Sequence, residues 1–250
     1  MNYRLTIQYD GTEFHGWQMQ GGLRTVQGEL ARVLTLLDGR EVLVQGAGRT
    51  DAGVHAAGQV ASVKLEREFE PLKLRGAING NLARDARVIE AAIVPDDFHA
   101  RFSARGKTYL YRIFNAPFMS PLWSRYAHHE ARVLSLEKMQ RAAACFPGSH
   151  DWTAFSAARS DVLTRVRTVT GLEVTEEWSE HGRGRLINIS ASADGFLRYM
   201  VRSIAGTLLA AGRGELDEAA IAHMIASGQR HRQAATAPAC GLTLMRVHYD

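Results

Sequence analysis

Polar and apolar residues alternate over the first ten positions of the chain. The apolar positions are Tyr3, Leu5, Ile7 and Tyr9. A period of two predicts a half-buried strand, which ends at the turn-forming pair Asp10–Gly11. After Thr25 the period changes, because apolar residues recur every three or four positions as far as Leu37. This spacing predicts an amphipathic helix with one buried face, and the Thr25 side chain is its expected N-cap.

Strands and helices remain mixed through the first half of the chain. Short apolar runs predict strands at 41–44, 59–65, 87–94 and 107–114. Pro71 is expected to open a short helix that extends to about Asn79, since proline is favoured in the first turn of a helix. The order lacks the regular alternation of parallel β-α-β units, so it favours an α+β fold with mainly antiparallel sheets.

Pro117 and Pro121 interrupt both periodic patterns and predict a domain boundary. We therefore expect two similar α+β domains, residues 1–116 and residues 117–250. The second domain is predicted to contain helices at 135–146, 196–211 and 217–227, and strands at 166–178, 185–192 and 242–249.

Composition limits the class of protein. Of the 250 residues, 46% are hydrophobic and 22% are charged, which is typical of a folded globular chain and excludes a disordered one. No apolar run reaches the roughly 18 residues of a membrane helix. The first residues also lack the apolar core of a signal peptide. We therefore expect a cytoplasmic protein with no membrane partner.

The basic residues of the chain are mostly arginines. Lysine occurs only at positions 64, 73, 107 and 138, so arginine supplies most of the 30 basic residues behind the net charge of +4. Arginine grips phosphates and stacks on bases. Genes rich in G and C produce the same bias, however, so the bias by itself leaves a nucleic-acid partner open.

Several catalytic signatures are missing from the sequence. It contains no GxSxG elbow, P-loop, HExxH motif or kinase motif pair. Gly46, Gly48 and Gly53 follow the spacing GxGxxxxG and lead to a predicted strand, unlike a dinucleotide-binding loop. The histidines and the two cysteines lack the spacing of zinc ligands. We therefore expect neither a metal site nor a cofactor.

The segment Gly46–Gln59 is the densest chemical feature of the sequence. Its glycines permit tight turns, and one cation and one anion, Arg49 and Asp51, lie at its centre. A carboxylate on a rigid loop beside an arginine can act as a nucleophile or a base. The alternative is an Asx-turn, in which Asp51 only binds the backbone of its own loop. The residues alone leave both interpretations open.

Two further segments combine basic and aromatic residues. On the strand predicted at 107–114, Tyr109 and Tyr111 share one face, where they can either stack on the bases of single-stranded RNA or fill the core of a sheet. On the helix predicted from Phe196, Arg198 and Arg202 lie one turn apart. They can be solvated, bind phosphate, or form an ion pair with a buried carboxylate.

Taken together, these segments resemble the TruA family of tRNA pseudouridine synthases over nearly the whole chain. The segment YDGTEFHGWQ at 9–18 is similar to the opening motif of that family, and 25–27 to the start of its first helix. The segment GRTDAGVHA at 48–56 resembles the active-site loop. FHARFSA at 98–104, followed by Tyr109, and GFL…MVR at 195–202 resemble the other site motifs.

The resemblance implies a function and a role for each candidate residue. The family isomerises uridine to pseudouridine at positions 38, 39 and 40 of the tRNA anticodon arm, without a cofactor or metal, as a homodimer. Asp51 would be the catalytic carboxylate, acting at C1′, at C6 or as a base at C2′. Arg49 would help to hold the flipped nucleotide or its phosphate, Tyr109 would stack on the uracil, and Arg202 would pair with Asp51 and keep it ionised. The two domains would meet in a cleft with Asp51 at its floor.

Two positions depart from the family pattern. Ala83 replaces a proline that the family often has before an acidic residue, here two positions ahead of Asp85, and Thr243 stands where an aromatic residue is common.

Two other classes of protein remain to be distinguished by experiment. One is an RNA-binding module in which Asp51 is structural, and the other is a metal-dependent nuclease, which the lack of clustered carboxylates near Asp51 disfavours.

Overall fold

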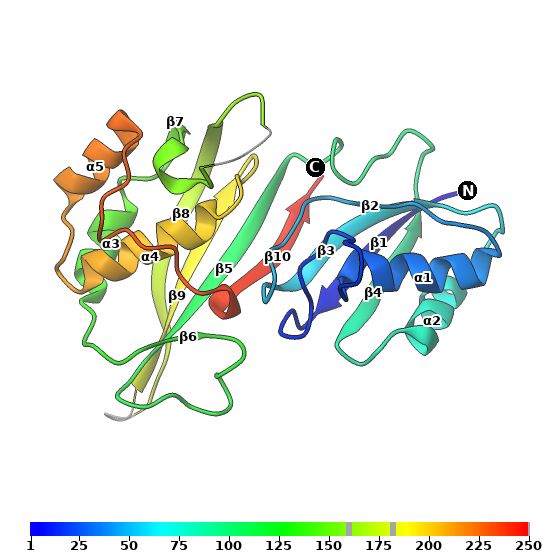
Figure 1. The fold of residues 1–250 in the computed structure, drawn as a ribbon, viewed down its shortest axis with the longest axis horizontal. Coiled ribbons are helices and arrows are strands. Elements are labelled where there is room, and N and C mark those ends of the chain that lie inside the picture. Colours follow the sequence, from blue (N-terminus) through cyan, green and yellow to red (C-terminus); the bar gives the residue numbers. More distant parts are fainter. Residues whose placement is uncertain (159–161, 181–183, 250) are drawn as a thin grey trace. The chain divides into compact units, whose positions relative to one another are not determined.

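The computed structural model describes residues 1–158, 162–180 and 184–249 (Figure 1). The chain forms two compact units. Unit 1 comprises Met1–Arg105 and Thr243–Asp250, and unit 2 comprises Gly106–Leu242. This division differs from the boundary expected at 116/117. The strand that precedes that boundary pairs along its length with a later strand of unit 2, and the last strand of the chain pairs within unit 1.

Unit 1 contains a mostly antiparallel sheet in the order β4-β1-β3-β10, with β2 also paired to β3. Its strands are β1 (Asn2–Tyr9), β2 (Val44–Gly46), β3 (His55–Lys64), β4 (Ala86–Ile93) and β10 (Leu242–His248). Only β10 runs parallel to its neighbour β3, with Thr243 opposite His55. The helices α1 (Val26–Asp38) and α2 (Pro71–Asn81) contact each other, and α2 packs on β4 (Figure 1).

In unit 2 the strands follow the order β5-β9-β8-β7 and pair mostly antiparallel, with the short β6 parallel to β5. Its strands are β5 (Gly106–Asn115), β6 (His128–Glu130), β7 (Gly148–Asp151), β8 (Val166–Glu180) and β9 (Gly184–Ala193). Its helices are α3 (Leu136–Ala143), α4 (Met200–Gly212) and α5 (Glu218–Ser227), with 3-10 turns at Thr153–Phe155 and Ala239–Gly241. The expected α+β class with mainly antiparallel strand pairing is confirmed.

Local sequence signals place some elements well and others badly. The helix expected after Thr25 is confirmed as α1, and the Thr25 hydroxyl accepts a hydrogen bond from the Gly28 N–H at 3.3 Å. The strand expected at 59–65 begins earlier, at His55, and the strand expected at 41–44 lies at Val44–Gly46. The helix expected from Phe196 begins at Met200, because Tyr199 has a left-handed backbone with φ 68°. The strands β6 and β7 were not predicted from the sequence.

Helix α4 forms the centre of unit 2. Each of its residues is buried except Arg202, and the structure describes the whole helix. A helix that is apolar on all sides belongs inside a protein, so the one charged side chain of α4 stands out against its surroundings. None of the helices in the described part of the chain is long and apolar enough to cross a membrane.

Gly206 allows the segment near Ala235 to lie directly against α4. A Cβ at position 206 would lie 1.7 Å from the Ala235 carbonyl oxygen, so any side chain must displace backbone. We expect Gly206→Ala to destabilise the protein by about 2 kcal/mol, as overpacking of a core does. For a chain of this size that corresponds to a melting temperature lowered by roughly 4–8 °C in a thermal unfolding experiment.

The matched control is Gly76→Ala in α2. A Cβ at Gly76 would meet nothing within 4 Å. The same substitution should therefore leave stability unchanged or raise it by up to about 1 kcal/mol through helix propensity. A Gly206→Ala variant as stable as Gly76→Ala would show that the segment near Ala235 is not held against α4.

Candidate active site

Asp51 opens a turn that the main chain closes. The Val54 N–H donates to the Asp51 carbonyl oxygen at 3.1 Å. Gly53 supplies the left-handed backbone of the turn, with φ 77°. A turn closed in this way forms whatever the side chain of its first residue is. The turn thus has a main-chain closure of its own, and the role of the Asp51 carboxylate stays a prediction.

The segment Tyr9–Trp17 braces this loop from outside. The Trp17 N–H donates to the Thr50 carbonyl oxygen at 3.1 Å, and the Gly53 N–H donates to the Phe14 carbonyl oxygen at 3.3 Å. Two glycines make the close approach possible. A Cβ at Gly11 would lie 2.0 Å from the Val54 carbonyl oxygen, and one at Gly16 would lie 2.6 Å from the Thr50 carbonyl oxygen.

Buried side-chain hydrogen bonds fix the loop on both sides of Arg49. The Tyr9 and Thr50 hydroxyl groups lie 2.8 Å apart, and the Gln59 amide donates to the Gly48 carbonyl oxygen at 2.9 Å. Burial raises the pKa of Tyr9 to about 12, so its hydroxyl group keeps its proton at neutral pH. Thr50 and Gln59 are buried, whereas Arg49 is exposed. The loop thus presents Arg49 outward from a rigid base, next to Asp51.

Tyr109 lies on β5 opposite Ala191 of β9. Its ring meets the ring of Phe196 edge-on, with 5.2 Å between the centroids and 89° between the planes, and the side chain is 7% exposed. Tyr111 on the same strand is fully buried, and its hydroxyl group donates to the Pro238 carbonyl oxygen at 3.0 Å. Of the two alternatives for Tyr111, the structure supports the core residue.

Arg202 lies in the first turn of α4 and is anchored to the segment that follows α5. Its Nε donates to the Ala237 carbonyl oxygen at 2.8 Å, and the Ala237 N–H donates to the Arg202 carbonyl oxygen at 3.0 Å. Arg198 precedes the helix, so the expectation that Arg198 and Arg202 share one helix face is wrong. Tyr199, with its left-handed backbone, lies between Arg198 and the first residue of the helix.

The four predicted site residues are divided between the two units. Arg49 and Asp51 belong to unit 1, where they lie in one loop. Tyr109 and Arg202 belong to unit 2, where Phe196 touches Tyr109 and Ala237 holds Arg202. The pairing of Asp51 with Arg202 therefore stays a prediction. It was not predicted from the sequence that the 9–17 segment braces the Asp51 loop. Gly11 and Gly16, which lie among aromatic residues, could have indicated this close approach of two backbone segments.

Both departures from the family pattern lie in unit 1. In the segment that contains Ala83, the Asp85 carboxylate accepts two hydrogen bonds from Arg24, at 2.6 and 2.9 Å. The Asp85 carbonyl oxygen also accepts from the Asp10 N–H at 2.9 Å. The segment is therefore held in place without the proline. Thr243 is buried on β10.

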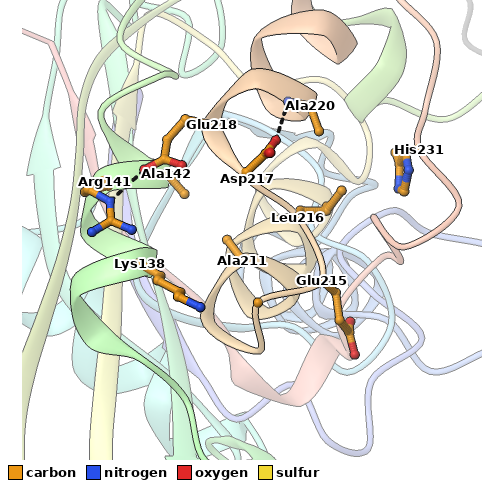
Figure 2. Close-up of a pocket in the computed structure, with 11 residues that line it drawn as sticks. Lys138, Arg141, Ala142, Ala211, Glu215, Leu216, Asp217, Glu218, Ala220 and His231 are labelled. Atoms are coloured by element: carbon orange, nitrogen blue, oxygen red, sulfur yellow. Dashed lines mark hydrogen bonds and ion pairs between the residues drawn. The ribbon is translucent and has the colours of Figure 1, made fainter.

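A pocket in unit 2 lies among α3, α4 and α5, and none of the four predicted residues lines it (Figure 2). Two of its charged side chains, Arg141 and Glu218, pair with each other. Arg141 donates to Glu218 at 2.7 Å, and Asp217 caps α5 by accepting from the Ala220 N–H at 2.8 Å. In the described part of the chain no group of three or more histidine, cysteine or acidic side chains could hold a metal ion.

Two comparisons with known proteins, one with family profiles and one with individual sequences, point to the same family. A family profile described as "tRNA pseudouridine synthase" matches residues 5–103 and 142–250, which include Arg49, Asp51 and Arg202 but not Tyr109. The chain is 42% identical to "tRNA pseudouridine synthase A" of Ruminiclostridium cellulolyticum, covering 98% of both chains. It is 40% identical to the protein of that name from Bacillus sp. strain KSM-64 and 41% identical to that of Acetivibrio thermocellus, covering 99% of each chain.

Proposed function

This chain belongs to the TruA family of tRNA pseudouridine synthases, and from that membership we propose that it modifies uridines 38, 39 and 40 of the tRNA anticodon arm, with Asp51 as its catalytic carboxylate. Its activity is that of a tRNA pseudouridine synthase, an isomerase. The observation that supports the proposal is the Asp51 loop, whose turn is closed by the main chain and which backbone and buried side-chain hydrogen bonds brace on both sides.

The reaction rearranges one nucleotide and needs no second reactant. The N1–C1′ bond of uridine breaks, the uracil turns, and a C5–C1′ bond forms while C5 loses its proton and N1 gains one. Because a stacked uracil hides its C1′ atom, the target nucleotide must be flipped out of the stem. Asp51 then acts as a nucleophile at C1′ or C6, or as a base at C2′.

Each of the other residues has a role that its surroundings support. Arg49 is exposed beside Asp51 and would bind the flipped nucleotide or its phosphate. Tyr109 would stack on the uracil, with Phe196 fixing its ring from the side. Arg202 lies at the N-terminal end of α4, where the helix dipole favours anions. There it would pair with the Asp51 carboxylate. A tRNA substrate also implies a cytoplasmic enzyme, and by family analogy we propose a homodimer.

The proposal is tested by its product. Unmodified tRNA incubated with the protein should gain pseudouridine at positions 38 to 40, mapped by chemical derivatisation, and C5-tritiated uridine in the tRNA should release its label. An RNA-binding module would shift tRNA in a gel but release no tritium. A metal-dependent nuclease would shorten the RNA and would stop when EDTA is added. Pseudouridine only at other positions would contradict the assigned target.

Tyr109 offers a separate prediction about the uracil. We expect Tyr109→Phe to keep tRNA binding, because the ring can still stack. Tyr109→Leu should lose more turnover than affinity, since the stacking of a base on an aromatic ring contributes roughly 1–3 kcal/mol. Turnover, tRNA affinity and melting temperature are compared for both variants.

The control for Tyr109 is Tyr111→Leu on the same face of β5. Tyr111 is a core residue, so its replacement should lower the melting temperature and reduce activity only in proportion to the folded fraction. If Tyr109→Leu behaves in the same way, with unchanged turnover per folded molecule, Tyr109 does not stack on the substrate.

A further inference from the structure

Tyr199 has an unusual backbone conformation. Among the residues that the structure describes, it is the one non-glycine residue with positive φ, at φ 68° and ψ −2°. Bulky residues avoid this left-handed region because Cβ crowds the backbone. Tyr199 occupies the N-cap position of α4 and makes no side-chain capping hydrogen bond there. Capping of the helix therefore does not account for this conformation, and strain of this kind clusters at functional sites.

The ring of Tyr199 contacts two arginines. The guanidinium carbon of Arg198 lies 4.8 Å from the ring centroid and that of Arg202 lies 5.1 Å from it. Both distances are within the range of cation–π attraction. Arg198 also donates a hydrogen bond to the Tyr199 hydroxyl group at 2.9 Å. The left-handed turn at Tyr199 thus places one aromatic ring against Arg202.

A second contact holds Arg202 from another side. Its Nε donates to the Ala237 carbonyl oxygen at 2.8 Å. The segment around Ala237 is itself tied to α4, since Arg230 donates to both Ser203 and Thr236. The Nε atom of Arg202 is thus bonded to the backbone, while the Tyr199 ring centroid lies 5.1 Å from its guanidinium carbon.

We propose that Tyr199 is a positioning residue for Arg202. The strained backbone holds the Tyr199 ring in a position that orients the Arg202 guanidinium. The guanidinium is then already in place to bind an anionic group, such as the Asp51 carboxylate, without rearranging first. The inference rests on the role proposed above for Arg202. It identifies Tyr199 as the residue that orients Arg202. It also gives a functional reason for the strained backbone at the start of the buried helix α4.

The test compares Tyr199→Gly with Tyr199→Phe. Glycine adopts positive φ without strain, so Tyr199→Gly should keep the wild-type melting temperature. It should nevertheless lower kcat at least about tenfold, the loss expected when a charged group is misplaced, with KM for tRNA little changed. Tyr199→Phe keeps the ring and should retain most of the turnover. If Tyr199→Gly does not fold, Tyr199→Asn decides the question, because asparagine tolerates the same backbone and lacks the ring.

Combination with Arg202→Ala separates the two hypotheses. If Tyr199 acts through Arg202, Tyr199→Gly should cause no further loss of single-turnover rate in an Arg202→Ala background. Wild-type kcat in Tyr199→Gly together with an impaired Arg202→Ala would overturn this inference alone. Wild-type activity in Arg202→Ala would overturn the proposed role of Arg202, and this inference with it. A fall in melting temperature that accounts for the whole loss of activity in Tyr199→Gly would reduce Tyr199 to a structural residue.

Discussion

The Asp51→Asn variant is expected to fold, to bind tRNA with near wild-type affinity and to form no detectable pseudouridine, even in single-turnover reactions with excess enzyme. Asparagine is almost isosteric with aspartate and keeps much of its hydrogen-bonding capacity, but it cannot act as a carboxylate nucleophile or base. The turn that starts at residue 51 is closed by its main chain and by Gly53, so the substitution should leave the loop in place.

The two interpretations of Asp51 predict opposite results from this one change. If Asp51 only shaped an Asx-turn, asparagine would serve nearly as well and activity would survive. The matched control is Asp97→Asn, the same substitution at an exposed position of unit 1, which should leave activity and melting temperature unchanged. Pseudouridine formed at more than a trace rate by a contamination-free Asp51→Asn preparation would overturn the central assignment.

Local signals in the sequence were sufficient for much of the fold. Thr25 predicted the start of α1 because an N-cap hydroxyl acts within three residues of chain. Alternating residues predicted β1 and most of β5 for a similar reason. The start of α4 was predicted wrongly because Phe196–Tyr199 has helical spacing, and nothing local indicates that Tyr199 takes a left-handed backbone.

The loop that carries Arg49 and Asp51 could be located from the sequence, but the contacts that hold it could not. The motif around Asp51 identified the loop, yet its rigidity comes from residues far away in sequence, such as Trp17 bound to Thr50. The need for glycine at position 11 follows from a neighbour, Val54, that only the folded chain brings close. The anchoring of Arg202 by Ala237 is of the same kind. Contacts between segments that are far apart in the chain produce no periodic pattern or fixed spacing of residues, so a single sequence does not predict them.

Replacement of Arg202 with alanine should damage catalysis far more than tRNA binding. If the guanidinium pairs with Asp51 and faces the charge that develops on the substrate, its loss should lower kcat by about 10²–10³-fold, as removal of one preorganised electrostatic group does. The helix should survive, because Arg202 is its one residue that is not buried and alanine is a good helix former. The melting temperature should therefore change little, apart from the lost hydrogen bond to Ala237.

Comparison with Arg232→Ala isolates the role of Arg202 from the loss of one positive charge. Arg232 is an exposed arginine of the same unit, so its removal should weaken tRNA binding slightly at low salt and leave kcat unchanged. An Arg202→Ala variant that loses affinity and turnover equally would place Arg202 on the phosphate backbone of the tRNA. A selective loss of turnover, with a salt dependence of binding equal to that of wild type, requires that Arg202 act where the bonds of uridine are exchanged.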